Sequence, residues 1–373
     1  MEVIKQFTKA VQSPASYMRD LKIKTDKKVV GYCCTYTPEE IIYAAGALPV
    51  RLFGAKEGIS KADAHLQAYS CSLVRGIMGD ALQGNLDYLD AMIFPHTCDS
   101  IQRLSDIWRL NILSTWHNDV VLPVKLGTLS SKEYMADVLE KFRKEIGDWI
   151  GRDITDDDLK NSIKVYNNLR LQLKRLYEIK SANPSVISGR DLYMIVKGST
   201  IIDRAETARL LEELVSSLEN KAETGKDDSK ARIVLSGGIC DHPDIYDLIE
   251  AAGGTVVWDD LCSGSRFFEG RIAEAGNPVN AIAKRYTDRV VCPAKHSSLK
   301  GRGENLVNIV KDNDARGVIF LLLKFCDPHA FDYPFIKEML DEINVPSMLL
   351  EIEQELPSSG QLATRFEAFL GML

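Results

Sequence analysis

The amino-acid sequence predicts an α/β protein with two doubly wound, parallel-sheet domains related by an internal repeat. Three observations lead to this prediction. Short apolar segments alternate with helical segments, which is typical of parallel sheets with crossover helices. The same order of strand, cysteine-bearing turn and helix occurs in the first and in the last third of the chain. A length of 373 residues also suits about two domains of ordinary size.

The repeat begins with a strand, a turn, a helix and a second strand. The first copy reads VVGYCCTYTPEEIIYAAGALPVRL over 29–52, and the second reads IVLSGGICDHPDIYDLIEAAGGTVVW over 233–258. In both copies a proline stands at the predicted helix start, acidic residues fill the first turn and a glycine ends the helix. Each placement matches the preference of a helix terminus, so both segments are predicted to fold alike.

The repeat continues with an apolar strand that ends in Cys-Asp. The two copies read DAMIFPHTCD over 90–99 and GVIFLLLKFCD over 317–327. Both runs have the length of a buried strand. The remaining elements predicted for the two copies are helices over 100–110 and 333–343 and closing strands over 120–126 and 346–352.

Helices are predicted before and between the two repeats. The first 20 residues should form an N-terminal helix, and 131–228 contains apolar positions at helical spacing. The polar stretch 221–230 is predicted as a linker. The predicted organisation is therefore an N-terminal helix with a first α/β domain over 1–130, a helical connecting segment over 131–230 and a second α/β domain over 231–373.

Composition excludes several classes of protein. Hydrophobic residues make up 45% and charged residues 27%, as in a soluble globular protein. A net charge of −7 gives no broad basic field, so we expect no nucleic-acid partner. No signal peptide and no apolar run of about 18 residues is found, so a cytoplasmic protein without a membrane span is expected. In that reducing compartment the eight cysteines should be metal ligands, nucleophiles or buried residues rather than disulfides.

The cysteines gather where ligands bind in parallel sheets, at the carboxyl ends of the strands. Seven of the eight lie near predicted strand or helix ends, namely Cys34, Cys71, Cys98, Cys240, Cys262, Cys292 and Cys326. Cys292 is predicted to end a strand over 289–291, and Cys71 to start a helix. If the two domains face each other, most of these thiols point into one cleft, where helix N-termini would stabilise thiolates and a negatively charged cluster.

Other interpretations of these cysteines stay open. Any one of them could be a small buried core residue. Structural zinc usually draws on local C-x-x-C pairs, which the chain lacks, whereas cysteines scattered along the chain suit an assembled iron–sulfur site. A catalytic Cys–His pair could involve His96, His242 or His329. Neither a phosphate loop nor G-x-G-x-x-G after a strand occurs, so no nucleotide site is predicted.

Three segments carry a resemblance to a known family. GYCCTYTPEEIIYAAG over 31–46, Cys98-Asp99 and FCDP over 325–328 resemble the 2-hydroxyacyl-CoA dehydratase and benzoyl-CoA reductase family, and the resemblance covers nearly the whole chain. It implies two flavodoxin-like or Rossmann-like halves with an iron–sulfur cluster between them. It also implies a separate ATP-hydrolysing iron–sulfur activator that injects one low-potential electron at a time, which would explain the missing phosphate loop.

The resemblance also implies a set of ligands. Cys71, Cys98 and Cys326 match the cysteines that hold a 4Fe-4S cluster in the family's subunits, and dehydratase β-subunits commonly have a cysteine like Cys262 as well. Counterparts of Cys34 and Cys292 resemble a branch with a double-cubane cluster, two 4Fe-4S units joined by a sulfide. Six cysteines are thus the expected cofactor and metal ligands: Cys34, Cys71, Cys98, Cys262, Cys292 and Cys326. Cys33 and Cys240 are surplus, although Cys33 could exchange roles with Cys34.

The function implied first is an ATP-dependent, low-potential reductase with a double-cubane cluster in the interdomain cleft. It would work as a homodimer on a small substrate, with ATP used only by the activator. The alternative is a lyase: a subunit of a 2-hydroxyacyl-CoA dehydratase, or of benzoyl-CoA reductase, with one 4Fe-4S cluster and an acyl-CoA substrate. A third possibility is an electron-transfer module in which protein ligands close every iron.

Overall fold

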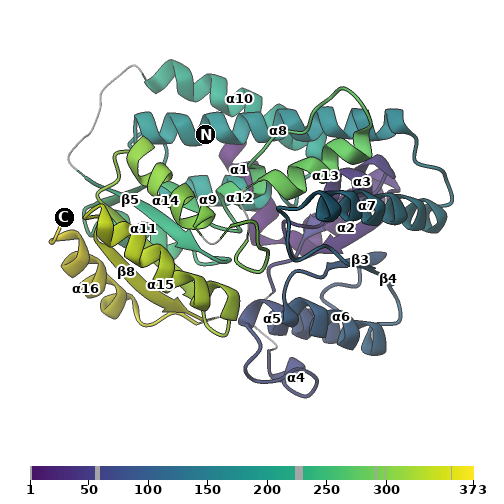
Figure 1. Ribbon diagram of the computed structural model, residues 1–373, viewed down its shortest axis with the longest axis horizontal. Coiled ribbons are helices and arrows are strands. Elements are labelled where there is room, and N and C mark those ends of the chain that lie inside the picture. Colours follow the sequence, from purple (N-terminus) through teal and green to yellow (C-terminus); the bar gives the residue numbers. More distant parts are fainter. Residues whose placement is uncertain (1, 55–58, 223–229, 290–291, 299, 354) are drawn as a thin grey trace.

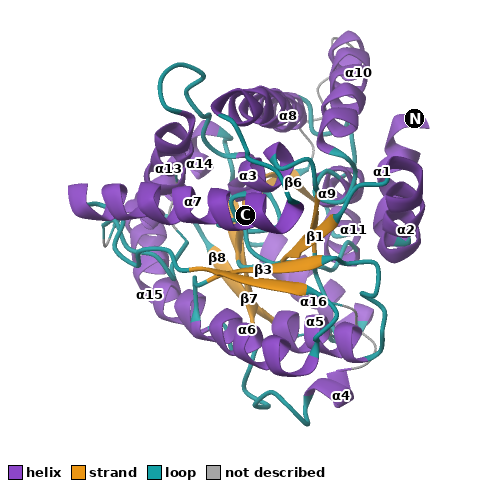
Figure 2. Ribbon diagram, turned by 90° about the vertical axis from the view of Figure 1, so that its right-hand side faces the viewer, coloured by secondary structure: helices purple, strands orange, loops and turns teal. Residues whose placement is uncertain are grey.

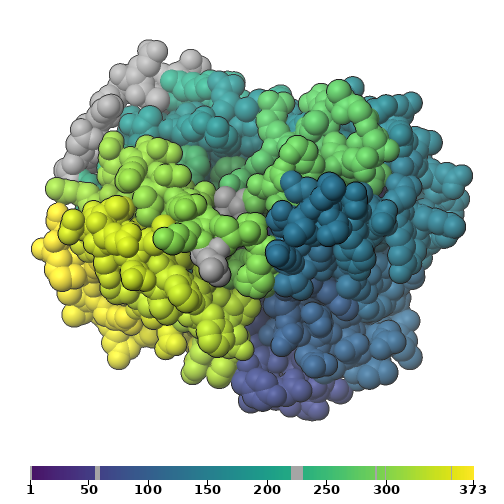
Figure 3. Space-filling view, viewed as in Figure 1, coloured from purple at the N-terminus to yellow at the C-terminus, as the bar shows by residue number. Residues whose placement is uncertain are grey.

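The computed structural model describes the whole chain except residues 1, 55–58, 223–229, 290–291, 299 and 354. Two four-stranded parallel sheets flanked by helices form the described part (Figures 1 and 2). The predicted α/β class with two parallel-sheet domains is therefore confirmed. The C-terminal half lies beside the N-terminal half, and Figure 3 shows them as the yellow-green and the purple-blue surfaces.

The two sheets share one strand order, which confirms the internal repeat. The first sheet has the order β2-β1-β3-β4 and the second β6-β5-β7-β8, and every neighbouring pair is parallel. This order is of the flavodoxin type, in which ligands bind where the strand order reverses. The strands are β1 Val29–Tyr32, β2 Leu48–Arg51, β3 Ala91–Pro95, β4 Trp116–Val120, β5 Ala231–Gly237, β6 Gly254–Asp260, β7 Gly317–Leu323 and β8 Ser347–Ile352.

The central strands are buried because helices cover the sheets. All residues of β1, β2 and β3 are buried, as are six of the seven in β7. Strands covered on both faces need continuous apolar runs, which is what these segments supply. The helices of the first half are α1 Glu2–Gln12, α2 Pro14–Thr25, α3 Glu39–Ala44, α4 Ile59–Ala62, α5 Ser72–Leu82 and α6 Asp99–Asn111.

Four helices connect the repeats, as predicted. They are α7 Leu129–Ile150, α8 Asp156–Ala182, α9 Gly189–Gly198 and α10 Arg204–Ala222. Thr128 and Thr155 cap α7 and α8 through reciprocal hydrogen bonds, which fixes where both helices begin. The long α8 packs on α3 of the first half and on β6 of the second, so it ties the halves together (Figure 1). The boundaries at 130 and 230 stay a prediction.

The described residues of the second half form six helices. They are α11 Asp244–Ala251, α12 Ser265–Phe268, α13 Pro278–Asp288, α14 Gly301–Asp312, α15 Asp327–Glu342 and α16 Ser359–Leu370. Among the described helices, none combines the length and the apolar character needed to cross a membrane.

Two predicted elements need correction. The closing strand of the first sheet is β4, and it ends at Val120, where we predicted a strand over 120–126 to begin. β4 is an edge strand of mixed, half-buried residues, so it lacks the apolar run that the prediction looked for. The helix predicted over 333–343 begins earlier, at Asp327, because Pro328 suits a helix start and the helix also accommodates Pro334.

Two further predictions fall largely on residues that the structure leaves out. Of the strand predicted over 289–291, Val290 and Val291 lie outside the described residues, and Arg289 caps the end of α13. Of the linker predicted over 221–230, 223–229 lie outside them, and α10 continues to Ala222.

Candidate functional site

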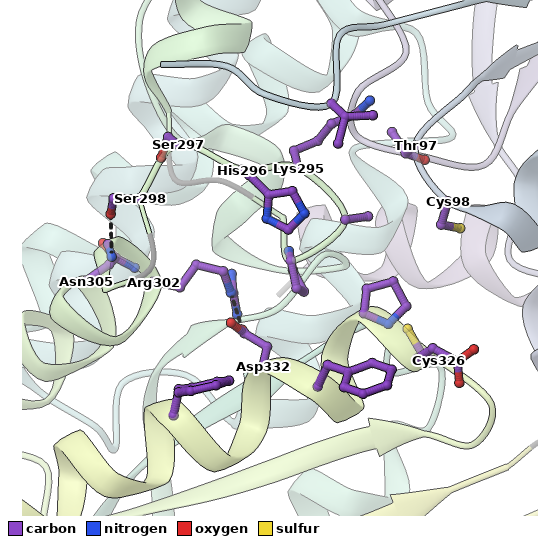
Figure 4. Close-up of a pocket in the computed structure, with 18 of the residues that line it drawn as sticks. Thr97, Cys98, Lys295, His296, Ser297, Ser298, Arg302, Asn305, Cys326 and Asp332 are labelled. Atoms are coloured by element: carbon purple, nitrogen blue, oxygen red, sulfur yellow. Dashed lines mark hydrogen bonds and ion pairs between the residues drawn. The ribbon is translucent and has the colours of Figure 1, made fainter. Parts of the chain in front are cut away.

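A cavity of about 850 Å³ lies where the two halves meet. Its walls come from both repeats, because Cys71 and Cys98 belong to the first half and Cys326 to the second. Figure 4 shows Cys98 and Cys326 on different walls of this cavity. These three cysteines, from both halves of the chain, therefore line one cavity.

We call the three cysteines that line the cavity, Cys71, Cys98 and Cys326, the outer group. Each of them stands directly before a helix. Cys71, Cys98 and Cys326 are the N-cap residues of α5, α6 and α15. Unpaired N–H groups and the positive end of a helix dipole therefore face each sulfur. Backbone N–H groups lower the three thiol pKa values in part. These N–H groups would stabilise the thiolate forms of the outer group.

Burial still dominates the pKa of the outer thiols. It raises the pKa of Cys326 to about 12 and that of Cys98 well above its ordinary range. The neighbouring thiolates add to the effect. Cys71 raises the pKa of both thiols; Cys326 and Cys34 also raise that of Cys98, and Cys292 and Cys262 also raise that of Cys326. These three sulfurs are therefore close enough to repel one another as thiolates, and metal binding would have to displace their protons.

Cys34, Cys262 and Cys292 form a second, inner group. The hydroxyl of Thr35, next to Cys34, lies 3.9 Å from the sulfur of Cys262. Burial raises the pKa of Cys34 to about 11, and Cys262 and Cys292 raise it further. The three inner thiols are therefore electrostatic neighbours, although they belong to both halves of the chain.

Thr97 lies between the two groups. It lines the outer cavity, and its hydroxyl donates a hydrogen bond to the sulfur of Cys34 over 3.5 Å. Cys34, Cys262 and Cys292 do not line that cavity themselves. Six of the eight cysteines thus divide into one group at the open cavity and one group behind it.

Buried cations surround the inner group. Arg51 donates from one nitrogen to the carbonyl oxygen of Cys262 over 2.8 Å and from another to its sulfur over 3.1 Å. Burial acts to raise the pKa of Cys262, but Arg51 and Arg266 outweigh burial and leave that pKa lowered. Lys295 is also buried, and burial lowers its pKa to about 8. Sequence reasoning missed Arg51, whose only signal is a charge at the end of an apolar strand.

Several buried polar atoms near the inner group lack a partner. Among the described residues, no hydrogen-bond partner exists for the Nε atoms of Arg51 and Arg289. Leaving such a donor unsatisfied costs about 1–3 kcal/mol. Arg289 also lies over the ring of Tyr36, at 4.1 Å from its centroid. These donors fit a negatively charged group beside the inner cysteines.

The arrangement differs from a site for one metal ion. Within the described ranges, no three His, Cys, Asp or Glu side chains converge closely enough to hold a single ion. In a cubane the cysteine ligands bind different irons and therefore spread around the cluster.

His329 is the histidine that contacts a cysteine, among the three considered from the sequence. Its Nδ1 lies 3.2 Å from the sulfur of Cys326, and its Nε2 lies 3.2 Å from Arg266. Burial, with Arg266 and Arg302, holds the pKa of His329 well below its usual range, so the imidazole is neutral at pH 7. His96 instead pairs with Asp119. His242 contacts the carbonyl oxygen of Glu353.

The two cysteines expected to be surplus, Cys33 and Cys240, are fully buried. Cys33 nevertheless lies near the site, because Cys34, Cys71 and Cys262 raise its pKa, so its exchange of roles with Cys34 stays a prediction. The thiol of Cys240 donates a long hydrogen bond, 3.9 Å, to the carbonyl oxygen of His242. Burial raises the pKa of Cys240 to about 12, as for an inert core thiol.

Comparison with known proteins assigns the chain to a family. The family model described as "2-hydroxyglutaryl-CoA dehydratase, D-component" (HGD-D) matches residues 34–373. The chain belongs to the HGD-D family. The resemblance seen in the sequence is thereby confirmed.

Relatives in the HGD-D family align with nearly the whole chain. The (R)-phenyllactyl-CoA dehydratase beta subunit of Clostridium sporogenes is 28% identical over 97% of this chain and 96% of its own length. Lactoyl-CoA dehydratase subunit beta of Anaerotignum propionicum is 28% identical over 100% of this chain and 98% of its own length. A benzoyl-CoA reductase subunit of Thauera aromatica is 29% identical over 90% of this chain and 87% of its own length. These HGD-D relatives are subunits of dehydratases and of a reductase, which supports an enzyme subunit here.

Proposed function

We propose that this protein is a low-potential iron–sulfur reductase whose six site cysteines hold a double-cubane cluster. The observation that supports this most is the division of the cysteines into two groups of three. Cys71, Cys98 and Cys326 line the open cavity, whereas Cys34, Cys262 and Cys292 lie behind it. Two cubanes that share a sulfide need three thiolates each, so two groups match the requirement of such a cluster.

The chain's own residues would hold and insulate that cluster. When bound, the cluster would supply electrons at low potential to a small substrate in the cavity. Three helix N-termini face the outer thiolates, and Arg51, Arg266 and Arg289 place positive charge beside the inner ones. Hydrogen bonds to sulfur and the burial of the ligands set the reduction potential of such sites.

The electrons would come from a separate protein. The chain carries neither a phosphate loop nor a G-x-G-x-x-G motif after a strand. We propose an ATP-hydrolysing iron–sulfur activator as this partner and a homodimer as the assembly. A sister subunit in place of the second copy would point to the alternative below.

The alternative is a lyase with a single 4Fe-4S cluster on the outer cysteines. Its support is the alignment over nearly full length with beta subunits of two acyl-CoA dehydratases. The substrate would then be an acyl-CoA, and the inner cysteines would be free thiols. The buried Arg51 and Arg289, whose Nε atoms have no hydrogen-bond partner among the described residues, favour the double cubane, because a negatively charged cluster would supply one. The open cavity beside the outer group argues against a pure electron-transfer module.

An iron and sulfide count separates these proposals. Protein purified without oxygen should contain about eight irons and nine sulfides per chain, against about four of each for one cubane. Replacing Cys292 by Ala should lower the iron to about four per chain or prevent assembly altogether. A Cys292→Ala variant that keeps the iron and the electron paramagnetic resonance (EPR) spectrum of the wild type would require the single-cubane alternative.

A further inference from the structure

His329 occupies a position from which it acts on one cysteine of the outer group. It is the third residue of α15, and Cys326 is the N-cap of that helix. Its backbone N–H is directed at the sulfur of Cys326, and its Nδ1 lies 3.2 Å from the same atom. One residue therefore presents two nitrogen atoms to one sulfur.

The partner on the other side of the ring decides which nitrogen carries the proton. Nε2 of His329 lies 3.2 Å from a terminal nitrogen of Arg266. A guanidinium group only donates hydrogen bonds, so Nε2 has to accept. In a neutral imidazole that accepts at Nε2, the proton is on Nδ1. Nδ1–H therefore lies 3.2 Å from the sulfur of Cys326 as its donor, and the backbone of Gly237 also forms a hydrogen bond with the ring.

Arg266 is held rigidly enough to fix this tautomer. Its Nε donates to Oδ1 of Asp260 over 2.7 Å, and another nitrogen donates to the carbonyl oxygen and to Oδ2 of Asp260 over 2.7 and 2.9 Å. Arg266 is 4% exposed and Asp260 1% exposed, so water does not compete for these bonds. Arg302 holds the other side of Asp260, with 3.1 Å between its nitrogen and Oδ2.

We propose that His329 is a positioning residue that donates a hydrogen bond from Nδ1 to the sulfur of Cys326 and thereby raises the reduction potential of the cluster bound there. The inference rests on the proposed function, because it requires a cluster on the outer cysteines. The physical reason is that added electron density collects partly on the thiolate sulfurs, and a donor stabilises the more negative, reduced state. A series of contacts from the buried Asp260 through Arg266 to His329 holds this donor next to Cys326.

Two substitutions at one position test the proposal. His329→Leu removes the donor, whereas His329→Asn retains an N–H near the place of Nδ1. We expect the Leu variant to keep its iron, to show a more negative potential in EPR-monitored redox titration, and to lose an exchangeable proton coupling in electron–nuclear double resonance. The Asn variant should restore both values toward those of the wild type. His117→Leu is the matched control, since this half-buried histidine contacts Ser105 and no cysteine.

Each outcome bears on the proposal. A Leu variant with the wild-type potential and proton coupling would overturn it. If the Leu variant loses its iron, the Asn variant distinguishes two explanations. An Asn variant that keeps the cluster at the wild-type potential supports hydrogen-bond donation. An Asn variant that also loses the cluster means that the imidazole ring acts by packing. Absence of a cluster from the wild-type protein would instead refute the proposed function, so the two failures are distinguishable.

Discussion

At the scale of single residues, the eight cysteines have unequal surroundings. Cys98 caps a helix at the open cavity, whereas Cys240 is fully buried and bonded to a backbone carbonyl. The sequence already indicated that most cysteines follow strands, but it gave Cys98 and Cys240 the same kind of position, after a predicted strand of one of the two repeats. Only the packing separates them, because their exposure depends on elements far away in the chain.

A pair of alanine substitutions tests this difference. Cys98→Ala should abolish cluster binding, because it removes a thiolate of the outer group. Cys240→Ala should keep the wild-type iron content and lower the free energy of unfolding by about 1–2 kcal/mol, as for a small core truncation. Iron analysis after anaerobic reconstitution, with urea unfolding of the cluster-free proteins, measures both. Equal loss of iron in the two variants would contradict the division into ligands and core thiols.

The arginines around the inner cysteines could not be predicted from the sequence. Arg51 ends an apolar strand, and Arg266 lies in a four-residue helix, so no periodic pattern marks either residue. Each acquires its role from a partner in another element: Arg51 from Cys262, and Arg266 from Asp260 and His329. The strands, by contrast, were predictable, because burial on both faces leaves a local apolar run. β4 was misplaced because an edge strand needs no such run.

At the scale of elements, the turn after β5 depends on a glycine. Gly237 has a φ of +149°, and a Cβ atom there would lie 2.1 Å from the carbonyl oxygen of Leu321 in the neighbouring strand β7. This close approach directs the chain from the sheet toward Cys240 and Cys262. No other residue type fits there without displacing one of the two strands.

Gly237→Ala should therefore lower the free energy of unfolding by about 3 kcal/mol, since backbone strain and a clash with the backbone add up. Gly46→Ala is the matched control. Gly46 also has a positive φ, +85°, but no atom lies within 4 Å of the place that a Cβ atom would take. It should cost only about 1–2 kcal/mol. Urea unfolding followed by circular dichroism compares the two, and equal losses would show that the contact with Leu321 is unimportant.

Buried ion pairs attach α3 to the connecting helices. Glu40 of α3 is fully buried and pairs with Arg170 of α8, and the hydroxyl of Tyr286 donates to it over 3.0 Å. Burial acts to raise the pKa of Glu40, but Arg170 and Arg285 outweigh burial and leave the pKa lowered. The carboxylate therefore stabilises the fold when it is ionised.

Glu40→Gln should lower the free energy of unfolding at pH 7 by about 3 kcal/mol, because it leaves buried guanidinium charge uncompensated. A depressed pKa in the folded state gives stability that is present above the ordinary pKa of about 4.3 and lost as the pH falls through the folded value. The difference from the wild type should accordingly shrink in acid. Glu213→Gln, at an exposed pair with Arg209, should change stability by less than about 0.5 kcal/mol at any pH. A difference for Glu40 that does not vary with pH would contradict the assignment.

At the scale of the whole molecule, the repeat places both sheets around one cavity. Both sheets have the same strand order, and each contributes a helix-capping cysteine that directly follows a central strand, Cys98 after β3 and Cys326 after β7. The sequence alone does not reveal what binds in the cavity, because the cavity lining combines segments from both halves.

The isolated chain should not hydrolyse ATP. Substrate reduction should require both a strong reductant and a partner ATPase, since no phosphate-binding motif occurs in the sequence. Phosphate release by the purified chain, measured with and without a candidate activator, tests this expectation. ATP turnover by the chain alone, retained after further purification, would contradict it.

The two halves are also connected across the cavity wall. Lys125 and His296 form an isolated parallel bridge, in which the N–H of Leu126 donates to the oxygen of His296 over 2.7 Å and the N–H of His296 donates to the oxygen of Val124 over 2.8 Å. Nearby, the ammonium of Lys295 reaches the oxygens of His96 and Leu122. Opening the halves like a clamshell would break all of these bonds together. We therefore expect small molecules to enter and leave through the mouth of the cavity while its walls stay closed. If the proposed cluster is bound there, the same hydrogen bonds would keep the reorganisation energy of each electron transfer small.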